Sequence, residues 1–293
     1  MLTKIAVYCL LYPLSLLPMA ILYGVAKIIY LVLYQLIRYR INVTRTNLKN
    51  SFPTFSRSKL KQIEKAYYVH LCNLFVEGVK MLSISRKELM KRYRCKNPEL
   101  VNQYFEQKKS VILMSSHYNN WEWMVLSLAM QFKHHGIGVG KENSNKSFEK
   151  TINLFRTRYG TEVVFAKTIR DVFQQYDNQQ KPTAYMMLSD QAPGSVKNPF
   201  MVNFLHQPSD MIFGGEYFAA KYDYPVLYYA VKQKKRGFYE FELELITDNP
   251  TLTSYGDITK KYTQLLERDI TNEPAYWLWS HKRWKHTINY IEN

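Results

Sequence analysis

The sequence has few of the residues that build extracellular scaffolds or low-complexity chains. Among its 293 residues there are three cysteines, Cys9, Cys72 and Cys95, an odd number without a CxxC pair. Such a set argues against a disulfide framework or a structural zinc site, and it is typical of a reducing compartment. Glycine and proline are also scarce, with 11 residues each, which excludes collagen-like and low-complexity chains. We therefore predict an ordinary folded protein without a metal site.

Acidic residues are missing from the first 63 positions, which contain nine lysines and arginines. The whole chain has 40 basic and 24 acidic residues, so nine of its 16 excess positive charges lie in the first fifth. A basic excess favours either nucleic acid or an anionic membrane surface as the partner. The chain lacks a helix-turn-helix, zinc or aromatic–basic RNA-binding pattern. We therefore expect an anionic membrane and no nucleic acid.

The acid-free region is also the most apolar part of the chain. Residues 5–26 carry no charge, and ten more uncharged residues follow Lys27. A helix needs roughly 20 apolar residues to cross a bilayer core, whereas the apolar part of a signal peptide has about 7–15. The stretch has no polar stripe, which argues against an amphipathic core helix. We predict that residues 1–40 form a membrane-anchoring helix, kinked at Pro13 and Pro18.

The cations around this segment predict its orientation. Lys4 precedes it, while Arg38, Arg40, Arg45 and Lys49 follow it. By the positive-inside tendency, the larger cluster and the chain behind it lie on the cytoplasmic side. The same cluster would lie against anionic lipid headgroups, at about 1 kcal/mol per cation.

After about residue 50, short apolar runs alternate with helical spacing. The apolar runs predict buried strands at 111–116, 136–140, 161–166, 183–190 and 225–233. Polar–apolar alternation predicts a half-exposed antiparallel strand at 238–247. Helical spacing predicts helices at 58–81 (with Ser58 as N-cap), 121–132, 147–159, 168–180, 209–222 and 257–271. This order predicts an α/β fold with a mixed, mostly parallel central sheet flanked by helices, in one domain over residues 41–293.

Two of the predicted strands end in polar residues that could carry chemistry. The run 111–116 continues into His117, with Glu122 five positions later, and the run 183–190 ends at Asp190. Ligands of open parallel sheets bind beyond the carboxyl ends of the strands. If Glu122 meets His117 across the turn, it fixes the imidazole tautomer and leaves the other nitrogen to take a proton from an alcohol. On spacing alone, purely structural roles for both residues are the more common explanation.

Several motifs of other enzyme classes are missing. There is no GxSxG turn, so a covalent acyl-enzyme is not indicated. There is also no glycine-rich phosphate loop and no dinucleotide fingerprint. We predict a reaction without a cofactor.

The sequence resembles a known family. His117 through Glu122 matches the HX4(D/E) motif of membrane-bound acyltransferases, and the chain is similar to the late acyltransferases of lipid A synthesis. Four further stretches match in order: 38–53 (RYRINVTRTNLKNSFP), 147–160 (SFEKTINLFRTRYG), 188–200 (LSDQAPGSVKNPF) and 276–285 (YWLWSHKRWK). The resemblance covers nearly the whole chain, and the ordered set is far more specific than one His–Glu pair.

The resemblance implies a glycerolipid-acyltransferase-like fold and an acyltransferase of the bacterial inner membrane, with its catalytic domain on the cytoplasmic face. The acyl donor would be an acyl carrier protein thioester and the acceptor a hydroxyl of a lipid A precursor. His117 would be the general base and Glu122 its orienting partner. Arg158, or alternatively Arg156, would bind an anionic group or stabilise charge at the thioester oxygen. Asp190 would hold Arg158 or the acceptor in place.

The sequence departs from the family pattern directly after Asp190. A second acid or an aromatic–glycine pair is expected there, and this chain has Gln191, Ala192, Pro193 and Gly194. The departure concerns the acceptor more than the reaction. A lysophospholipid or an aminolipid is therefore kept as an alternative acceptor, and a non-catalytic, membrane-docked protein is the remaining alternative.

Overall fold

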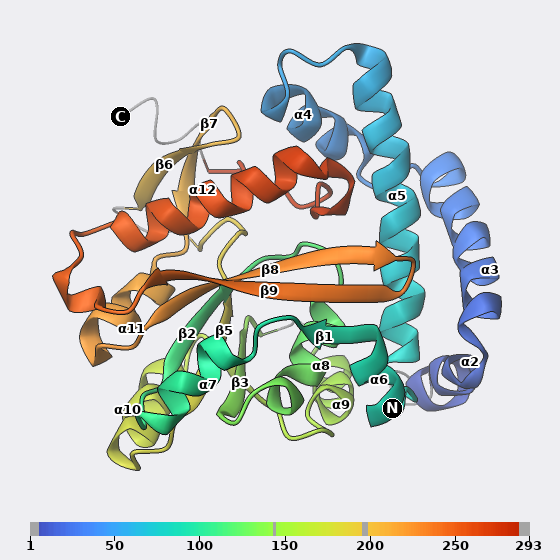
Figure 1. The fold of residues 1–293 in the computed structure, drawn as a ribbon. Helices are drawn as coiled ribbons and strands as arrows, with labels where there is room; N and C mark the ends of the chain where they lie inside the picture. The colour runs from blue at the N-terminus through green and yellow to red at the C-terminus, as the bar shows by residue number, and fades with distance from the viewer. Residues whose placement is uncertain (1–5, 143–144, 195–198, 287–293) are drawn as a thin grey trace.

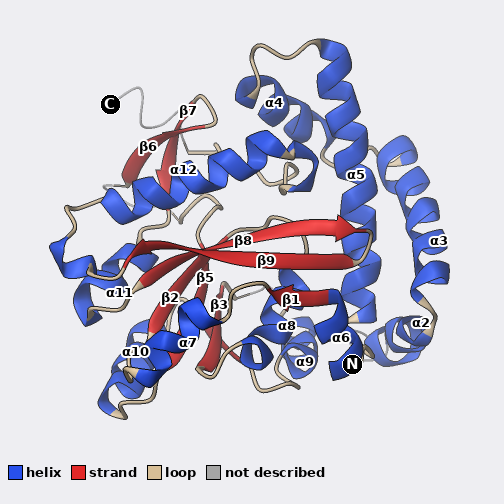
Figure 2. Cartoon of the chain, viewed as in Figure 1, coloured by secondary structure: helices blue, strands red, loops and turns tan. Residues whose placement is uncertain are grey.

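A seven-stranded sheet forms the centre of the protein (Figures 1 and 2). The computed structural model describes residues 6–142, 145–194 and 199–286. Neighbouring strands are parallel except for the antiparallel pair β8–β9, so the predicted mixed, mostly parallel α/β fold is confirmed. In spatial order the strands are β1 (Tyr93–Cys95), β9 (Phe238–Thr247), β8 (Val226–Lys235), β2 (Val111–Ser115), β5 (Thr183–Leu188), β3 (His135–Gly140) and β4 (Glu162–Phe165).

The central strand β2 shows why the sheet has helices on both faces. All five of its side chains are buried. Ile112 and Met114 join one hydrophobic cluster, whereas Val111 and Leu113 join another, because successive side chains of a strand point to opposite faces. Helices α10 (Ile169–Asn178), α11 (Gly214–Tyr222) and α12 (Asp257–Asn272) contribute to the first cluster. Helices α6 (Arg86–Arg92), α7 (Glu99–Glu106), α8 (Trp121–Gln131) and α9 (Lys146–Arg156) contribute to the second.

The long helix α5 (Arg57–Lys80) crosses the end of the β8–β9 hairpin (Figure 1). Its N-cap is Ser56, two residues before the predicted Ser58: the hydroxyl of Ser56 accepts a hydrogen bond from the backbone N–H of Lys59 at 3.2 Å. Tyr67, Tyr68 and Val76 are buried along it. The helix thereby supplies a wall that stands beside the sheet.

The N-terminal segment packs along α5 as a broken series of helices (Figure 1). Its elements are η1 (Ala6–Leu11, π-helical), α2 (Tyr12–Leu16), α3 (Met19–Tyr30) and η2 (Leu31–Leu36, π-helical). The break lies at Pro18, whose extended backbone precedes α3, and this agrees with the expected kink. Residues Met19–Leu36 form one helical stretch long and apolar enough to cross a membrane. Only 17% of that stretch is buried, whereas a core helix would be mostly buried, so the stretch is not a core helix.

Two segments far apart in the sequence lie together at the end of α5. Helix α4 (Ile41–Ser51) follows the N-terminal segment, and its residue Asn47 donates to the carbonyls of Trp279 and His281 at 2.8 and 2.9 Å. Arg40 donates to the carbonyl of Ser280 at 3.1 Å. The basic turn at 38–53 and the Trp/His/Arg-rich segment at 276–285 therefore support each other.

The largest local difference from the sequence prediction lies in the region 200–222. A helix is predicted over 209–222, but the structure has a hairpin of β6 (Phe200–Phe204) and β7 (Gln207–Met211), and α11 begins at Gly214. The two residues of its turn, Leu205 and His206, have φ of 51° and 62°. Such turns usually contain Asn and Gly, and this pair carries no turn signal that the sequence could have revealed.

Candidate active site

The sheet topology places two predicted site residues side by side. Strands β2 and β5 are parallel neighbours, and Ser115 is in register with Leu188. The backbone N–H of Ser189 donates to the carbonyl of Ser115 at 3.0 Å, which extends the pairing by one residue. His117 and Asp190 therefore leave the sheet at the same edge, beyond its carboxyl ends.

His117 and Asp190 form a closely connected pair. His117 Nδ1 lies 2.8 Å from Asp190 Oδ1, and the backbone N–H of His117 donates to Asp190 Oδ2 at 3.0 Å. The indole Nε1–H of Trp277 donates to the same Oδ2 at 2.9 Å. From the sequence we expect Glu122 to orient the imidazole; in the structure the contact to the ring is made by Asp190.

The electrostatics of Asp190 favour an ionised carboxylate beside the imidazole. Burial alone would raise the pKa of this carboxyl, which is 1% exposed. The neighbouring His117 and the hydrogen bonds from His117 and Trp277 outweigh burial and hold the pKa below its ordinary value. An ionised Asp190 accepts the Nδ1–H of His117. With a proton on Nδ1, Nε2 is the ring nitrogen left to accept one.

The turn between β2 and α8 is built to hold His117 in place. Asn119 has a left-handed backbone (φ 58°), which asparagine tolerates better than most residues. Its side chain donates to the carbonyl of Val231 at 2.9 Å, and its N–H donates to the carbonyl of Tyr276 at 3.0 Å. The ring of Trp121 meets the His117 ring edge-on, with centroids 5.3 Å apart. These contacts restrain the imidazole from several sides.

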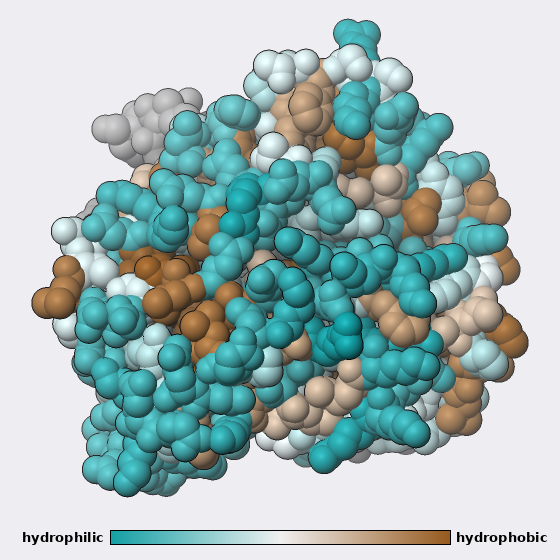
Figure 3. Space-filling model, viewed as in Figure 1, coloured by the Kyte–Doolittle hydropathy of each residue, from teal (hydrophilic) through white to brown (hydrophobic). Residues whose placement is uncertain are grey.

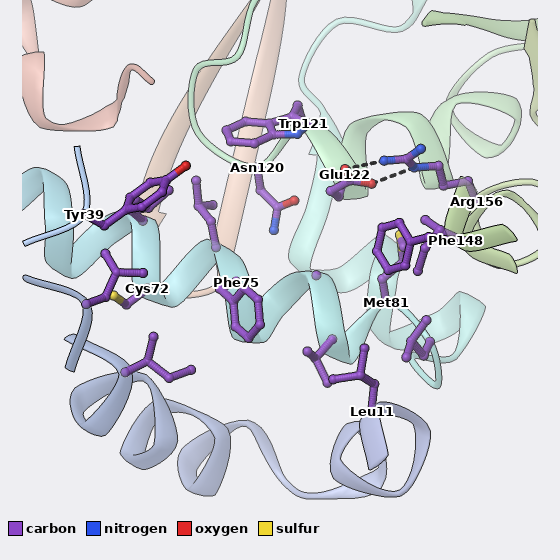
Figure 4. A pocket seen from close by; sticks show the side chains of 18 residues that line it. Leu11, Tyr39, Cys72, Phe75, Met81, Asn120, Trp121, Glu122, Phe148 and Arg156 are labelled. Atoms are coloured by element: carbon purple, nitrogen blue, oxygen red, sulfur yellow. Dashed lines mark hydrogen bonds and ion pairs between the residues drawn. The ribbon is translucent and has the colours of Figure 1, made fainter. Parts of the chain in front are cut away.

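Glu122 pairs with an arginine instead of the histidine. Its two carboxylate oxygens accept from Nε and from the second terminal nitrogen of Arg156, at 2.8 and 2.6 Å (Figure 4). This geometry is the bidentate pairing that guanidinium and carboxylate groups favour. Glu122 lies in the first turn of α8 and Arg156 at the end of α9. The contact thus joins two helices on the same face of the sheet.

Arg158 lies two positions later and points elsewhere. Its guanidinium donates to the carbonyl of Leu82 at 3.0 Å and to the carbonyl of Ile84. It also stacks against the ring of Tyr159, 4.6 Å from the centroid. The hydrogen bonds of Arg158 therefore hold the connection after α5, while those to Glu122 from Arg156 reach the first turn of α8, directly after the turn that carries His117.

Two cavities adjoin each other at the first turn of α8. An apolar cavity of about 590 Å³ lies between the N-terminal segment, α5 and α8 (Figure 4), within the usual size of ligand pockets. Trp121, Glu122 and Arg156 line this cavity and also line the second one. The remaining lining of the apolar cavity is mostly aliphatic and aromatic, and includes Leu11, Ile29, Leu33, Leu71, Phe75, Val79, Met81, Leu82, Phe148 and Ile152.

The second cavity, of about 1320 Å³, lies beyond the carboxyl ends of β3, β4 and β5. His117 lines it, together with residues of the Asp190 loop such as Gln191 and Gly194. Besides Arg156, five basic side chains line it: Lys141, Lys146, Lys167, Arg170 and Lys285. Glu142 also lines it and pairs with Lys146 and Lys167, and basic side chains remain in excess. We call it the strand-end cavity; its charge suits an anionic ligand.

The C-terminal segment contributes residues whose roles the sequence did not reveal. Trp277 and Trp279 are buried, at 2% and 0% exposure, so both belong to the core. His281 lines the strand-end cavity and accepts from the N–H of Ala192 at 3.3 Å. Burial lowers the pKa of His281 to about 4, so it is neutral at neutral pH. The motif at 276–285 points to this region, but the contact between Trp277 and Asp190 depends on the fold.

Metal-ligating side chains do not gather at this site. Across residues 6–142, 145–194 and 199–286, no group of three or more His, Cys, Asp or Glu side chains is arranged to hold a metal ion. The side chains that line the larger of the two cavities include the imidazole of His117 and the guanidinium of Arg156.

The comparison with known proteins agrees with this arrangement. A family model described as "Bacterial lipid A biosynthesis acyltransferase" matches residues 2–286, which is nearly the whole chain. No curated protein gives a significant match. Since the match includes both cavities, the His117–Asp190 pair and the N-terminal segment, we conclude that the chain belongs to the bacterial lipid A biosynthesis acyltransferase family.

Proposed function

We propose that this protein transfers a fatty acyl chain from an acyl carrier protein thioester to a hydroxyl of a lipid A precursor, without a covalent intermediate. The observation that carries the proposal is the His117–Asp190 pair at the junction of an apolar and a basic cavity. The apolar cavity suits an acyl chain, and the strand-end cavity suits an acceptor with anionic groups. The reacting atoms would meet beside Trp121.

The proposed chemical step uses His117 Nε2 as the general base. Nε2 takes the proton of the acceptor hydroxyl as its oxygen attacks the thioester carbonyl. The carbon–sulfur bond of the resulting tetrahedral intermediate then breaks. The leaving thiolate takes the proton from Nε2, so an ester and a free thiol are formed and the neutral imidazole is restored. Asp190 keeps Nδ1 protonated and stabilises the transient imidazolium.

We assign charge stabilisation to Arg156 and its positioning to Glu122. A guanidinium stays protonated at any physiological pH and can stabilise negative charge on the thioester oxygen. The bidentate bonds to Glu122 hold Arg156 at the place where the cavities meet. Geometry favours Arg156 over Arg158 for this role, because Arg158 is occupied by the carbonyls of Leu82 and Ile84.

The outer surface supports docking of the N-terminal segment to a membrane. Figure 3 shows hydrophobic residues along the edge of the molecule where Figure 1 places α3. Exposed apolar side chains of this segment are Tyr8, Leu10, Tyr12, Leu16, Ile21, Ile28, Leu31, Val32, Leu36 and Ile37. Val69 and Phe75 extend the apolar surface onto α5. We propose that this surface lies in the bacterial inner membrane, with the site facing the cytoplasmic leaflet.

Reconstitution with defined substrates tests the proposed function. The full-length protein is incubated with an acyl carrier protein thioester or the matching coenzyme A thioester. Each donor is paired with a lipid A precursor, a lysophospholipid or an aminolipid, and the products are identified by mass spectrometry. We expect one added acyl chain on the lipid A precursor, with the carrier protein as donor. Acylation of another acceptor alone would contradict the lipid A assignment, and no transfer from either donor would contradict an acyltransferase.

The two arginines offer a matched pair of variants. We expect Arg156→Lys to lower kcat by about 100-fold, because lysine cannot reproduce the bidentate pairing or the same charge placement. Arg158→Lys should instead lower the melting temperature, because the carbonyls of Leu82 and Ile84 lose donors, while kcat of the folded protein falls less than about threefold. Steady-state kinetics and thermal unfolding of both variants check this. A larger loss of kcat in Arg158→Lys than in Arg156→Lys would assign charge stabilisation to Arg158 instead.

A further inference from the structure

We infer that Glu77 is a positioning residue that ties the turn carrying Trp121 and Glu122 to the N-terminal segment. The inference rests on the proposed function and concerns how the site is held together. Glu77 lies on α5 and is fully buried. It has no place in the proton transfer itself. Its role follows from the side chains that meet at its carboxylate.

Three elements donate hydrogen bonds to this carboxylate. The hydroxyl of Tyr23 on α3 donates to Oε1 at 2.7 Å. The side-chain amide of Asn120 and the hydroxyl of Tyr239 on β9 both donate to Oε2, each at 2.7 Å. In addition, Trp123 Nε1 donates to the backbone carbonyl of Glu77 at 3.0 Å. Glu77 thus lies at the meeting point of α3, α5, α8 and β9.

Asn120 connects this meeting point to the candidate active site. Its Oδ1 accepts from the backbone N–H of Trp123 at 2.9 Å and caps α8, while its Nδ2 donates to Glu77. Figure 4 shows Asn120 extending from the start of α8 toward α5, next to Trp121 and Glu122. Both ends of the amide are therefore engaged. The bond to Glu77 sets the place of the first turn of α8 relative to α5.

Tyr23 connects the same carboxylate to the N-terminal segment. Its ring lies under the guanidinium of Arg236, 4.0 Å from the centroid, and a Cβ added at Gly237 would come within 2.0 Å of its hydroxyl. The hairpin turn at Gly237 (φ 70°) thus leaves room for this hydroxyl. The contact fixes α3 against both α5 and the β8–β9 turn.

The link matters because the N-terminal segment is also a wall of the apolar cavity. Leu11, Ile29 and Leu33 line that cavity opposite Glu122 and Arg156. If α3 shifts, the apolar wall moves relative to the turn that carries the proposed reacting groups. Through Tyr23 and Asn120, Glu77 keeps the wall and the turn in one arrangement. The segment is then part of the active site as well as an anchor.

A swap of polarity tests the Glu77–Asn120 bond. We expect Asn120→Asp to keep the helix cap but to lower kcat by about 30-fold, because a carboxylate oxygen replaces the donor that faces Glu77. Glu77→Gln alone should cost less, because its amide can turn its oxygen toward Asn120 and donate to Tyr23. In the double variant Glu77→Gln/Asn120→Asp, the new amide can donate to the new carboxylate. We expect its kcat to return to within about threefold of Glu77→Gln.

The outcomes are read from kcat, KM and thermal unfolding of the full-length protein. A positioning role predicts a loss in kcat with little change in KM, and rescue in the double variant. The inference is overturned if Asn120→Asp keeps wild-type kcat, or if the double variant is no more active than Asn120→Asp. The wild-type protein is assayed alongside. Absence of wild-type turnover would contradict the proposed function itself. The two outcomes that overturn the role of Glu77 can be observed only when the wild type is active.

A second pair of variants tests the connection to the N-terminal segment. Tyr23→Phe removes the hydroxyl that reaches Glu77 and keeps the ring beside Arg236. Tyr224→Phe is the matched control, because its hydroxyl also donates to one carboxylate, Asp177, at 2.7 Å, and neither residue lines either cavity. We expect about a fivefold loss of kcat in Tyr23→Phe and less than about twofold in Tyr224→Phe. Equal kcat in the two variants would overturn the connection.

Discussion

Replacing His117 with glutamine is expected to lower kcat by about 10⁴-fold, the upper range for loss of a general base. Glutamine keeps a polar side chain of similar reach but cannot take a proton from a hydroxyl at neutral pH. Asp190 would still have the N–H of residue 117 and the indole of Trp277 as donors, so we expect the fold to persist. Product formation by mass spectrometry, together with thermal unfolding, measures both effects.

The chain contains a matched control for this variant. His135 also contacts a carboxylate, with Nε2 at 2.9 Å from Glu162, but it lies at the first residue of β3, at the opposite end from the strand-end cavity. We expect His135→Gln to keep kcat within about twofold of wild type. If His117→Gln retained more than a tenth of the wild-type rate, His117 would not be the base and the mechanism would fail.

The sequence was a sufficient guide to the fold where hydrophobic patterns are strong. The apolar run at 111–116 and the alternating segment at 238–247 became β2 and β9 almost residue for residue. The pattern failed where the turn chemistry is unusual, as at Leu205 and His206, and where a strand is as short as β1. Side-chain periodicity needs several residues to show a period, and positive φ at ordinary residues has no compositional signal.

The site was only partly predictable for a different reason. His117 and Asp190 could each be placed at a strand end from local sequence, but their contact requires β2 and β5 to be neighbours. Strand order depends on packing across the whole sheet, so spacing along the chain pointed to Glu122 instead. The same limit applies to Arg156 and Arg158, which differ in direction because one helix, α9, ends between them. The sequence therefore identified the residues of the site but not the contacts between them.

Replacing Asp190 with asparagine is expected to lower kcat by about 10³-fold while the protein still folds. An asparagine can accept from only one side, so it either loses the Nδ1–H of His117 or turns an N–H toward Trp277 and the backbone of residue 117. The imidazole then loses its fixed tautomer and the charge that stabilises its protonated form. The unpaired buried donors should also cost about 2 kcal/mol of unfolding free energy.

A control is needed because a carboxylate-to-amide change in any buried position lowers stability. Glu216 is buried and accepts from the backbone N–H groups of Gly256 and Thr259, the latter at 2.8 Å, at the start of α12. We expect Glu216→Gln to lower the free energy of unfolding. It should not cause the loss of kcat of about 10³-fold that is expected when His117 loses its fixed tautomer. Similar kcat losses in both variants would mean that general destabilisation, and not the state of His117, explains the effect at Asp190.

The pH dependence of stability separates the charge of Asp190 from its shape. Its pKa is lowered in the folded protein, whereas an unfolded aspartate titrates near about 3.9. The ionised carboxylate therefore stabilises the fold above about pH 4, and this contribution is lost as the pH falls toward the folded-state pKa. The difference in unfolding free energy between wild type and Asp190→Asn should be constant near neutrality and shrink below about pH 4. If the difference in unfolding free energy stays constant on acidification, the stability loss in Asp190→Asn comes from packing. Asp190 would then not hold the tautomer of His117 by its charge.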